Sequence, residues 1–148
     1  MTQPEAKTTQ GELNIEEVEP KTQTLCFTDQ HLECAVLFNI IIMRNNEEQI
    51  QSDDKPDSCV WVYIGSPGSP VFKSLSVAMN TRFSKKPMGT DIIGWNSGAD
   101  RVAKTFAERL GIKFKKTIFY VSYNIDNELS LQSFAEKRVH ATLKELLQ

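Results

Sequence analysis

The stretch Glu33–Arg44, ECAVLFNIIIMR, decides the fold class of this chain. It is filled with β-branched and aromatic residues, which is typical of a strand. Because alternate side chains of a strand point to opposite faces of a sheet, this strand presents two apolar rows. The rows are Val36, Phe38, Ile40 and Ile42 on one side and Leu37, Ile41 and Met43 on the other. The sheet that contains this strand therefore needs a cover on each of its faces.

Further strands are expected on both sides of this stretch. They are predicted at Thr22–Thr28, Cys59–Gly65, Lys73–Phe83, Thr90–Ile93 and Thr117–Asn124. The strands at Cys59–Gly65 and Thr117–Asn124 are also apolar on both faces. Because the first four strands are joined by connections without helices, we expect them to pair antiparallel, each with the next.

The strand expected at Lys73–Phe83 alternates between two kinds of side chain, and it follows a turn at Ser66–Pro70 that contains two prolines and a glycine. Alternation of this kind predicts one drier and one wetter face. The drier face would carry Leu75, Val77, Met79 and Phe83, and the wetter face Ser76, Ala78, Asn80 and Arg82.

Two helices complete the predicted fold. Ser97 is expected to cap the first, and Gly111 to end it with a left-handed residue. The second is expected over residues 130–147. Each helix has one apolar stripe, which in the first is Val102, Ala103, Phe106, Ala107 and Leu110 and in the second Leu131, Ala135, Val139, Thr142 and Leu146. A helix is about 10 Å wide and strands lie about 4.8 Å apart, so two helices cover about four strands on one face. The sequence predicts an α+β fold, a mostly antiparallel sheet of about five to six strands with two helices packed on one face.

The second sheet face is then left without a cover from the chain. A large exposed apolar face usually marks an interface, so this pattern predicts half of a dimer, or a subunit that stacks its sheet on a partner. The alternative is that loops and residues 66–72 fold over the face.

Residues 1–20 differ from the rest of the chain. They hold five glutamates, one lysine and no aromatic residue, so their charge is −4. Such a segment buries too little apolar surface to offset the entropy of ordering, and we expect a flexible acidic tail. Residues 21–148 are predicted to form a single α+β domain.

Signals for chemistry are weak throughout the sequence. Gly94–Gly98 lacks the spacing of a nucleophile elbow, and the three cysteines form no metal-binding pattern. The net charge of −2 argues against a nucleic-acid binder, and no apolar run is long enough to span a membrane. We therefore expect no enzyme activity, no cofactor, no metal, and no nucleic-acid or membrane partner. Reduced cysteines and the lack of a targeting signal predict a protein of the cytoplasm. The same features also allow a location in the nucleus.

Three stretches, in order, carry a resemblance to a known family. They are LSVAMNTRF at Leu75–Phe83, FYVSYN at Phe119–Asn124 and FAEKRV at Phe134–Val139. With the Trp61–Gly65 strand before them and the Val102–Leu110 helix between, they resemble the proteasome assembly chaperone 4 family from about residue 24 to 147. The acidic tail and a longer 44–57 loop depart from that pattern.

The resemblance implies a non-enzymatic chaperone that promotes assembly of the 20S proteasome α ring. It further implies a dimer with proteasome assembly chaperone 3, contact with α-type subunits, and release before the particle matures. A homodimer is possible when that partner is absent. The alternative is an adaptor subunit of a trafficking or signalling complex. Because aromatic residues and arginine dominate interface energies, the expected contact residues are Trp61, Tyr63, Arg82, Phe83, Tyr123 and Arg138.

Overall fold

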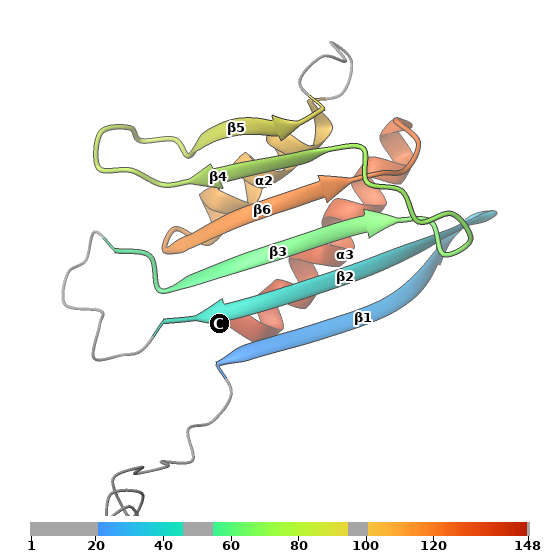
Figure 1. Ribbon diagram of the computed structural model, residues 1–148, viewed down its shortest axis with the longest axis horizontal. Coiled ribbons are helices and arrows are strands. Elements are labelled where there is room, and N and C mark those ends of the chain that lie inside the picture. Colours follow the sequence, from blue (N-terminus) through green and yellow to red (C-terminus); the bar gives the residue numbers. More distant parts are fainter. Residues whose placement is uncertain (1–20, 46–54, 95–100, 148) are drawn as a thin grey trace, which may run out of the picture.

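The computed structural model describes residues 21–45, 55–94 and 101–147. In this part of the chain, six strands form one sheet in the order β1-β2-β3-β6-β4-β5, and two helices lie beside it (Figure 1). The α+β fold class is confirmed. The acidic tail lies outside the described residues. The elements are β1 Thr22–His31, β2 Cys34–Arg44, β3 Ser58–Gly65, β4 Leu75–Met79, β5 Met88–Ile93, α2 Val102–Lys113, β6 Thr117–Tyr123 and α3 Leu129–Leu147.

The position of β6 in the sheet differs from the prediction. β1, β2 and β3 pair antiparallel in sequence order, as expected. β6, however, lies between β3 and β4, parallel to β3 and antiparallel to β4, so the predicted pairing of β3 with β4 is wrong. The physical reason is that β6, TIFYVSY, has large apolar side chains on both faces. Such a strand is most stable in the interior of a sheet, where both of its edges are paired and neighbouring strands flank its side chains on each face.

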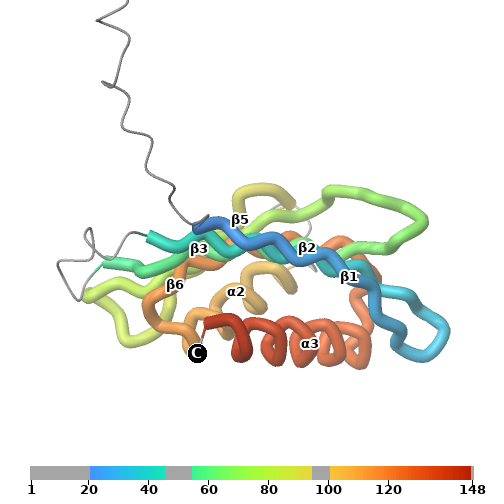
Figure 2. The backbone as a smooth tube through the Cα atoms, turned by 90° about the horizontal axis from the view of Figure 1, so that it is seen from below, coloured from blue at the N-terminus to red at the C-terminus, as the bar shows by residue number. Residues whose placement is uncertain are grey.

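Both helices lie on the same face of the sheet, which is called the helix face below; the opposite face is called the open face. Figure 2 shows the sheet edge-on with α2 and α3 on one side of it. α2 packs on β6, β4 and β5, and α3 contacts β1 and β2, for example through Phe134 against the ring of Phe38.

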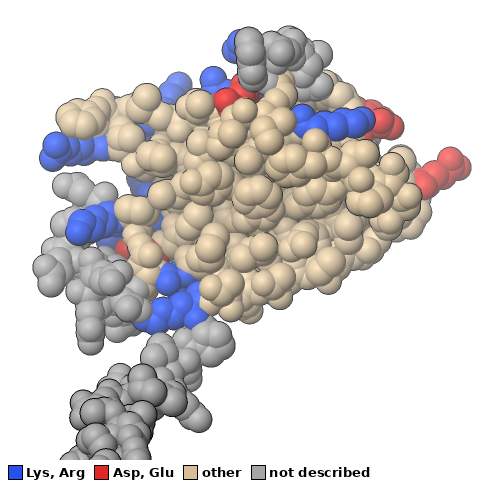
Figure 3. All heavy atoms as spheres, in the orientation of Figure 1, with Lys and Arg blue, Asp and Glu red and all other residues tan. Residues whose placement is uncertain are grey.

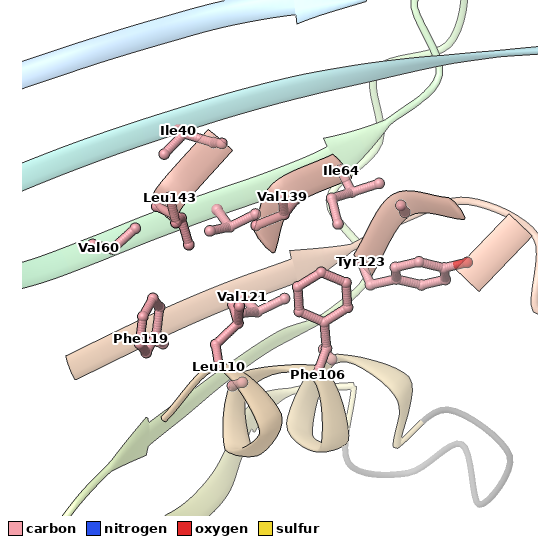
Figure 4. Close-up of a cluster of buried hydrophobic side chains, with 14 of the residues drawn as sticks. Ile40, Val60, Ile64, Phe106, Leu110, Phe119, Val121, Tyr123, Val139 and Leu143 are labelled. Carbon is pink, nitrogen blue, oxygen red and sulfur yellow. The ribbon is translucent and has the colours of Figure 1, made fainter. Parts of the chain in front are cut away.

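The core fills the space between the helices and the sheet. In Figure 4, Phe106 and Leu110 of α2 and Val139 and Leu143 of α3 point toward the strands, where Val121 of β6 lies among them. Each of these five side chains is at most 2% exposed. The predicted apolar stripes of the two helices are therefore confirmed as the core-facing sides.

Leu75 is buried as predicted, but from Ser76 to Met79 the two faces of β4 are reversed relative to the prediction. Ser76 and Ala78, expected on the wetter face, are 1% and 0% exposed, whereas Met79, expected on the drier face, is 39% exposed. Small side chains here allow α2 to approach the sheet closely, and the Ser76 hydroxyl donates to Asp91 Oδ1 at 2.6 Å. The strand is also shorter than predicted, because the chain leaves the ladder at Asn80, whose side chain bonds α2 and the turn after it.

Both predicted ends of the first helix are wrong. α2 begins at Val102, its N-cap residue is Arg101 without a side-chain cap, and Ser97 lies outside the described residues. Gly111 is a buried residue inside the helix rather than its left-handed end. A Cβ on Gly111 would lie 2.9 Å from Pro87 Cγ, so this glycine allows α2 to approach the β4–β5 hairpin.

Candidate protein–protein interface

The open face is an uncharged, largely apolar surface that spans all six strands. The register places one residue from each strand in a single row across it, in the order Thr24, Ile41, Trp61, Tyr120, Val77 and Thr90. None of the six carries a charge. Figure 3 shows this face, with its middle free of charged side chains and the lysine, arginine and acidic groups at its margins.

Three aromatic rings lie together near the centre of the open face. The ring of Trp61 stacks on Tyr120, with centroids 6.2 Å apart and planes 23° apart. It also stacks on Phe72, again at 6.2 Å, with planes 3° apart. Phe72 remains 48% exposed. These rings offer a partner a broad, rigid apolar anchor of the kind that dominates interface energies.

The segment between β3 and β4 covers one end of this face. Tyr63 donates its hydroxyl hydrogen to the Val71 carbonyl oxygen at 2.6 Å, and the Tyr63 ring lies over Gly65, where a Cβ would be 2.6 Å from Tyr63 Cε1. The sequence left open the alternative that loops and residues 66–72 fold over this face, and the segment does cover part of it. It leaves Met43, Met79 and the row through Trp61 partly or fully accessible.

A buried hydrogen-bond network fixes that segment to the sheet. The Asn124 amide donates to the Ile64 carbonyl oxygen (3.2 Å), and its Oδ1 accepts from the backbone N–H of Lys73 (2.6 Å) and of Ser74 (3.3 Å). The Ser74 hydroxyl donates to the Tyr123 carbonyl oxygen at 2.7 Å. The network holds the ends of β3 and β6 to the start of β4 and so determines where Phe72 lies.

Arg82 and Phe83 lie in the β4–β5 hairpin, beyond the end of β4, and not at the centre of the open face. Phe83 is 84% exposed, and the Arg82 guanidinium carbon is 4.9 Å from its ring centroid. They line a groove with Lys55 and Lys115 at the edge of the sheet. The structure therefore places these two predicted contact residues next to the open face, with their side chains accessible.

Tyr123 and Arg138 lie on the helix face. Tyr123 is 6% exposed, its hydroxyl donates to the Asp126 carbonyl oxygen at 2.9 Å, and burial, with a smaller effect of the Asp126 charge, raises its pKa above the ordinary tyrosine value. Arg138 Nε donates to Asp29 Oδ2 at 3.1 Å, and its guanidinium lies over the Phe27 ring. Both residues make contacts within the chain, and their role in partner binding stays a prediction.

The described residues show no group of metal-ligating side chains, and none of the helices described is both long and apolar enough to cross a bilayer. The three cysteines are free thiols. Cys59, in β3 beside the open face, is half-buried, and this burial raises its pKa, which keeps the thiol protonated at neutral pH.

Comparison with known proteins agrees with this geometry. Residues 54–125 match the model of the proteasome assembly chaperone 4 family. The resemblance noted from the sequence is thereby confirmed for the part that holds β3 to β6. No curated protein matches the chain. Among solved structures, a chain of a crystal structure described as a novel chaperone complex for yeast 20S proteasome assembly matches with a TM-score of 0.65 and 14% identity, covering 86% of this chain and 99% of that chain. At this identity the match shows a shared fold.

The proteasome assembly chaperone 4 match includes Trp61, Tyr63, Arg82, Phe83 and Tyr123, and it ends before Arg138. Sequence reasoning missed two residues of the aromatic cluster, which are Phe72 and Tyr120. Tyr120 could have been found, because it alternates with the core residues Phe119 and Val121. Phe72 lies outside any strand, so no periodicity indicated that its ring would pack on the open face.

Proposed function

We propose that this chain is a proteasome assembly chaperone 4 and promotes assembly of the 20S proteasome α ring without catalysis. The observation that carries the proposal is the uncharged open face centred on Trp61 and Tyr120. A chain with this face exposed gains stability by burying it, and the family match indicates which kind of complex supplies the partner.

The proposed partner at the open face is proteasome assembly chaperone 3. Stacked sheets pack about 10 Å apart, so a partner with a related sheet would cover the row from Thr24 to Thr90 face to face. When that partner is absent, a second copy of this chain would be the alternative cover. The dimer would then hold α-type subunits and leave when a later assembly partner needs the same space.

An introduced charge in the open face tests this interface. Ile41→Glu places a carboxylate in the row next to Trp61, where a bound partner would remove it from water. Ala141→Glu adds the same charge on an exposed position of α3 and serves as the matched control. In size-exclusion chromatography with light scattering, Ile41→Glu should remove the complex with proteasome assembly chaperone 3, and Ala141→Glu should preserve it. If both variants keep the complex, the open face is not the interface.

Affinity purification of the tagged chain from its own cells, followed by mass spectrometry, tests the wider role. The expected partners are a second small α+β chaperone and α-type proteasome subunits, with few mature β subunits. Recovery of subunits from an unrelated trafficking or signalling complex would instead support the adaptor alternative. Imaging of the same tagged chain would test the proposed location in the cytoplasm, and possible presence in the nucleus.

A further inference from the structure

A basic groove lies at the edge of the sheet, where the open face ends at Met79 and Ile118. It has a volume of about 490 Å³, and no aspartate or glutamate is among the described residues that line it. Its walls combine positive charge with exposed apolar groups. The residues that matter here are Lys55, Met79, Arg82, Phe83, Lys115 and Ile118.

The walls of this groove are fixed by hydrogen bonds. The Asn80 amide donates to the carbonyl oxygens of Gly111 (2.8 Å) and Lys115 (2.9 Å), which ties the β4–β5 hairpin to the turn before β6. The backbone N–H of Asp57 donates to the Lys116 carbonyl oxygen at 2.8 Å, which ties the entry of β3 to the same turn. The groove is thus formed in the free chain and needs no partner to shape it.

The acidic segment of the chain begins at the same edge. Arg44 N–H donates to the Lys21 carbonyl oxygen at 3.0 Å, and Arg44 pairs with Ser58, which in turn pairs with Thr117, a residue that lines the groove. Lys21 is therefore three strand spacings, about 14 Å, from the groove. At about 3.4 Å per extended residue, four or five residues of chain cover this distance.

We infer that residues 1–20 dock in cis on this groove. Glu16 and Glu17 lie at the right distance along the chain from Lys21, and the segment carries a charge of −4 opposite lysines and an arginine. Leu13, Ile15 and Val18 lie between its glutamates, and the exposed Phe83 ring and Met79 thioether of the groove offer them an apolar surface. Because the segment is covalently attached, its effective concentration at the groove is in the millimolar range even for weak pairing. The acidic segment then shields the basic edge from other acidic ligands.

The residues at 46–54 supply a competing source of negative charge. This loop contains Glu47, Glu48, Asp53 and Asp54 and leads directly into Lys55. The N-terminal segment has five carboxylates rather than four, and its Glu16 and Glu17 are within reach of the groove along the chain. A test of the inference must therefore separate the two sources.

The experiment compares amide spectra of the full ¹⁵N-labelled chain in three forms. In the tail variant, Glu12, Glu16, Glu17 and Glu19 are each replaced by Gln. In the loop variant, Glu47 and Glu48 are replaced by Gln and Asp53 and Asp54 by Asn, which removes the same number of charges. At low salt, the amides of Arg82, Lys115 and Ile118 should shift in the tail variant only. At about 1 M salt, where the Debye length falls to about 3 Å, the spectra of the wild type and the tail variant should coincide at these amides.

Two results would overturn the inference. One is that the tail variant leaves these amides at their wild-type positions at low salt. The other is that the loop variant shifts them and the tail variant does not. A reciprocal pair adds a control, because Arg82→Gln with Lys115→Gln should shift the amides of Glu16 and Glu17, whereas Lys137→Gln with Lys144→Gln, exposed on α3, should not. Unchanged peak positions on dilution would show that docking occurs within one chain.

Discussion

The two faces of the sheet are built from the same strands, and in β2 both carry large apolar side chains, yet only one face is buried. In β2, Phe38 and Ile40 on the helix face are completely buried, whereas Leu37 and Ile41 on the open face are partly exposed, and Met43 is 39% exposed. The two faces differ in burial because two helices cover one face and a short segment covers only part of the other. An apolar strand therefore indicates how much cover a sheet needs, and the elements that follow determine which face a partner must supply.

The largest expected effect is on the helix face of β6. Phe119→Ala removes a ring that is completely buried against Phe114 and should lower the free energy of unfolding by about 3–5 kcal/mol. Tyr120→Ala, the next residue on the open face, should cost the free chain less than half as much, because its ring is already partly exposed. Urea unfolding of both variants gives the comparison.

Equal losses in the two variants would contradict the distinction between the faces. They would mean that the open face stabilises the free chain as strongly as the core does. The proposed interface would then be part of the fold of a single chain and not a surface that waits for a partner.

The sequence was enough to predict the apolar rows of β2 and the core stripes of both helices, because each depends on local periodicity. It was not enough to place β6 between β3 and β4, since strand order depends on which edges meet in space. The sequence also did not predict which face of β4 is buried. Ser76 and Ala78 look solvent-facing by composition, but their small size is what α2 requires for close packing. Of the candidate site, Trp61 was predictable as an aromatic in a doubly apolar strand, whereas the packing of Phe72 depends on the Asn124 network.

The second prediction concerns the segment that partly covers the open face. Asn124→Ala removes the acceptor for the Lys73 and Ser74 N–H groups and a donor to Ile64, and should cost about 2–3 kcal/mol because buried backbone groups lose their partners. Loss of the network should also free Phe72 from Trp61 and shift the Trp61 fluorescence to longer wavelength. A Trp95→Phe background makes Trp61 the sole tryptophan. An unchanged spectrum would show that the network does not position the segment.

The third prediction concerns a smaller loss of stability and compares one tyrosine hydroxyl on each face. Tyr63→Phe and Tyr123→Phe each remove one hydroxyl that donates to a backbone carbonyl oxygen, at 2.6 and 2.9 Å. Each should lower the free energy of unfolding by about 1 kcal/mol. Only Tyr63→Phe should change the Trp61 emission, because only Tyr63 holds the segment beside it. Equal emission changes in the two variants would argue against a local role for Tyr63.

The smallest effect is expected at the rim of the helix face. Arg138 pairs with Asp29 and lies over Phe27, but about 41% of its side chain is exposed, so Arg138→Ala should cost only about 0.2–1 kcal/mol. Arg109→Ala, which breaks the pair with Glu136, is the matched control. Thermal unfolding should show that the loss of stability in each variant is smaller at about 1 M salt than at low salt, because the charges are then screened.

Because the stability cost is small, Arg138→Ala separates two roles for this residue. If complex formation with proteasome assembly chaperone 3 weakens at least tenfold in Arg138→Ala and not in Arg109→Ala, the helix-face rim contacts the partner. If neither changes it, Arg138 serves only to hold α3 against β1, and binding is confined to the open face.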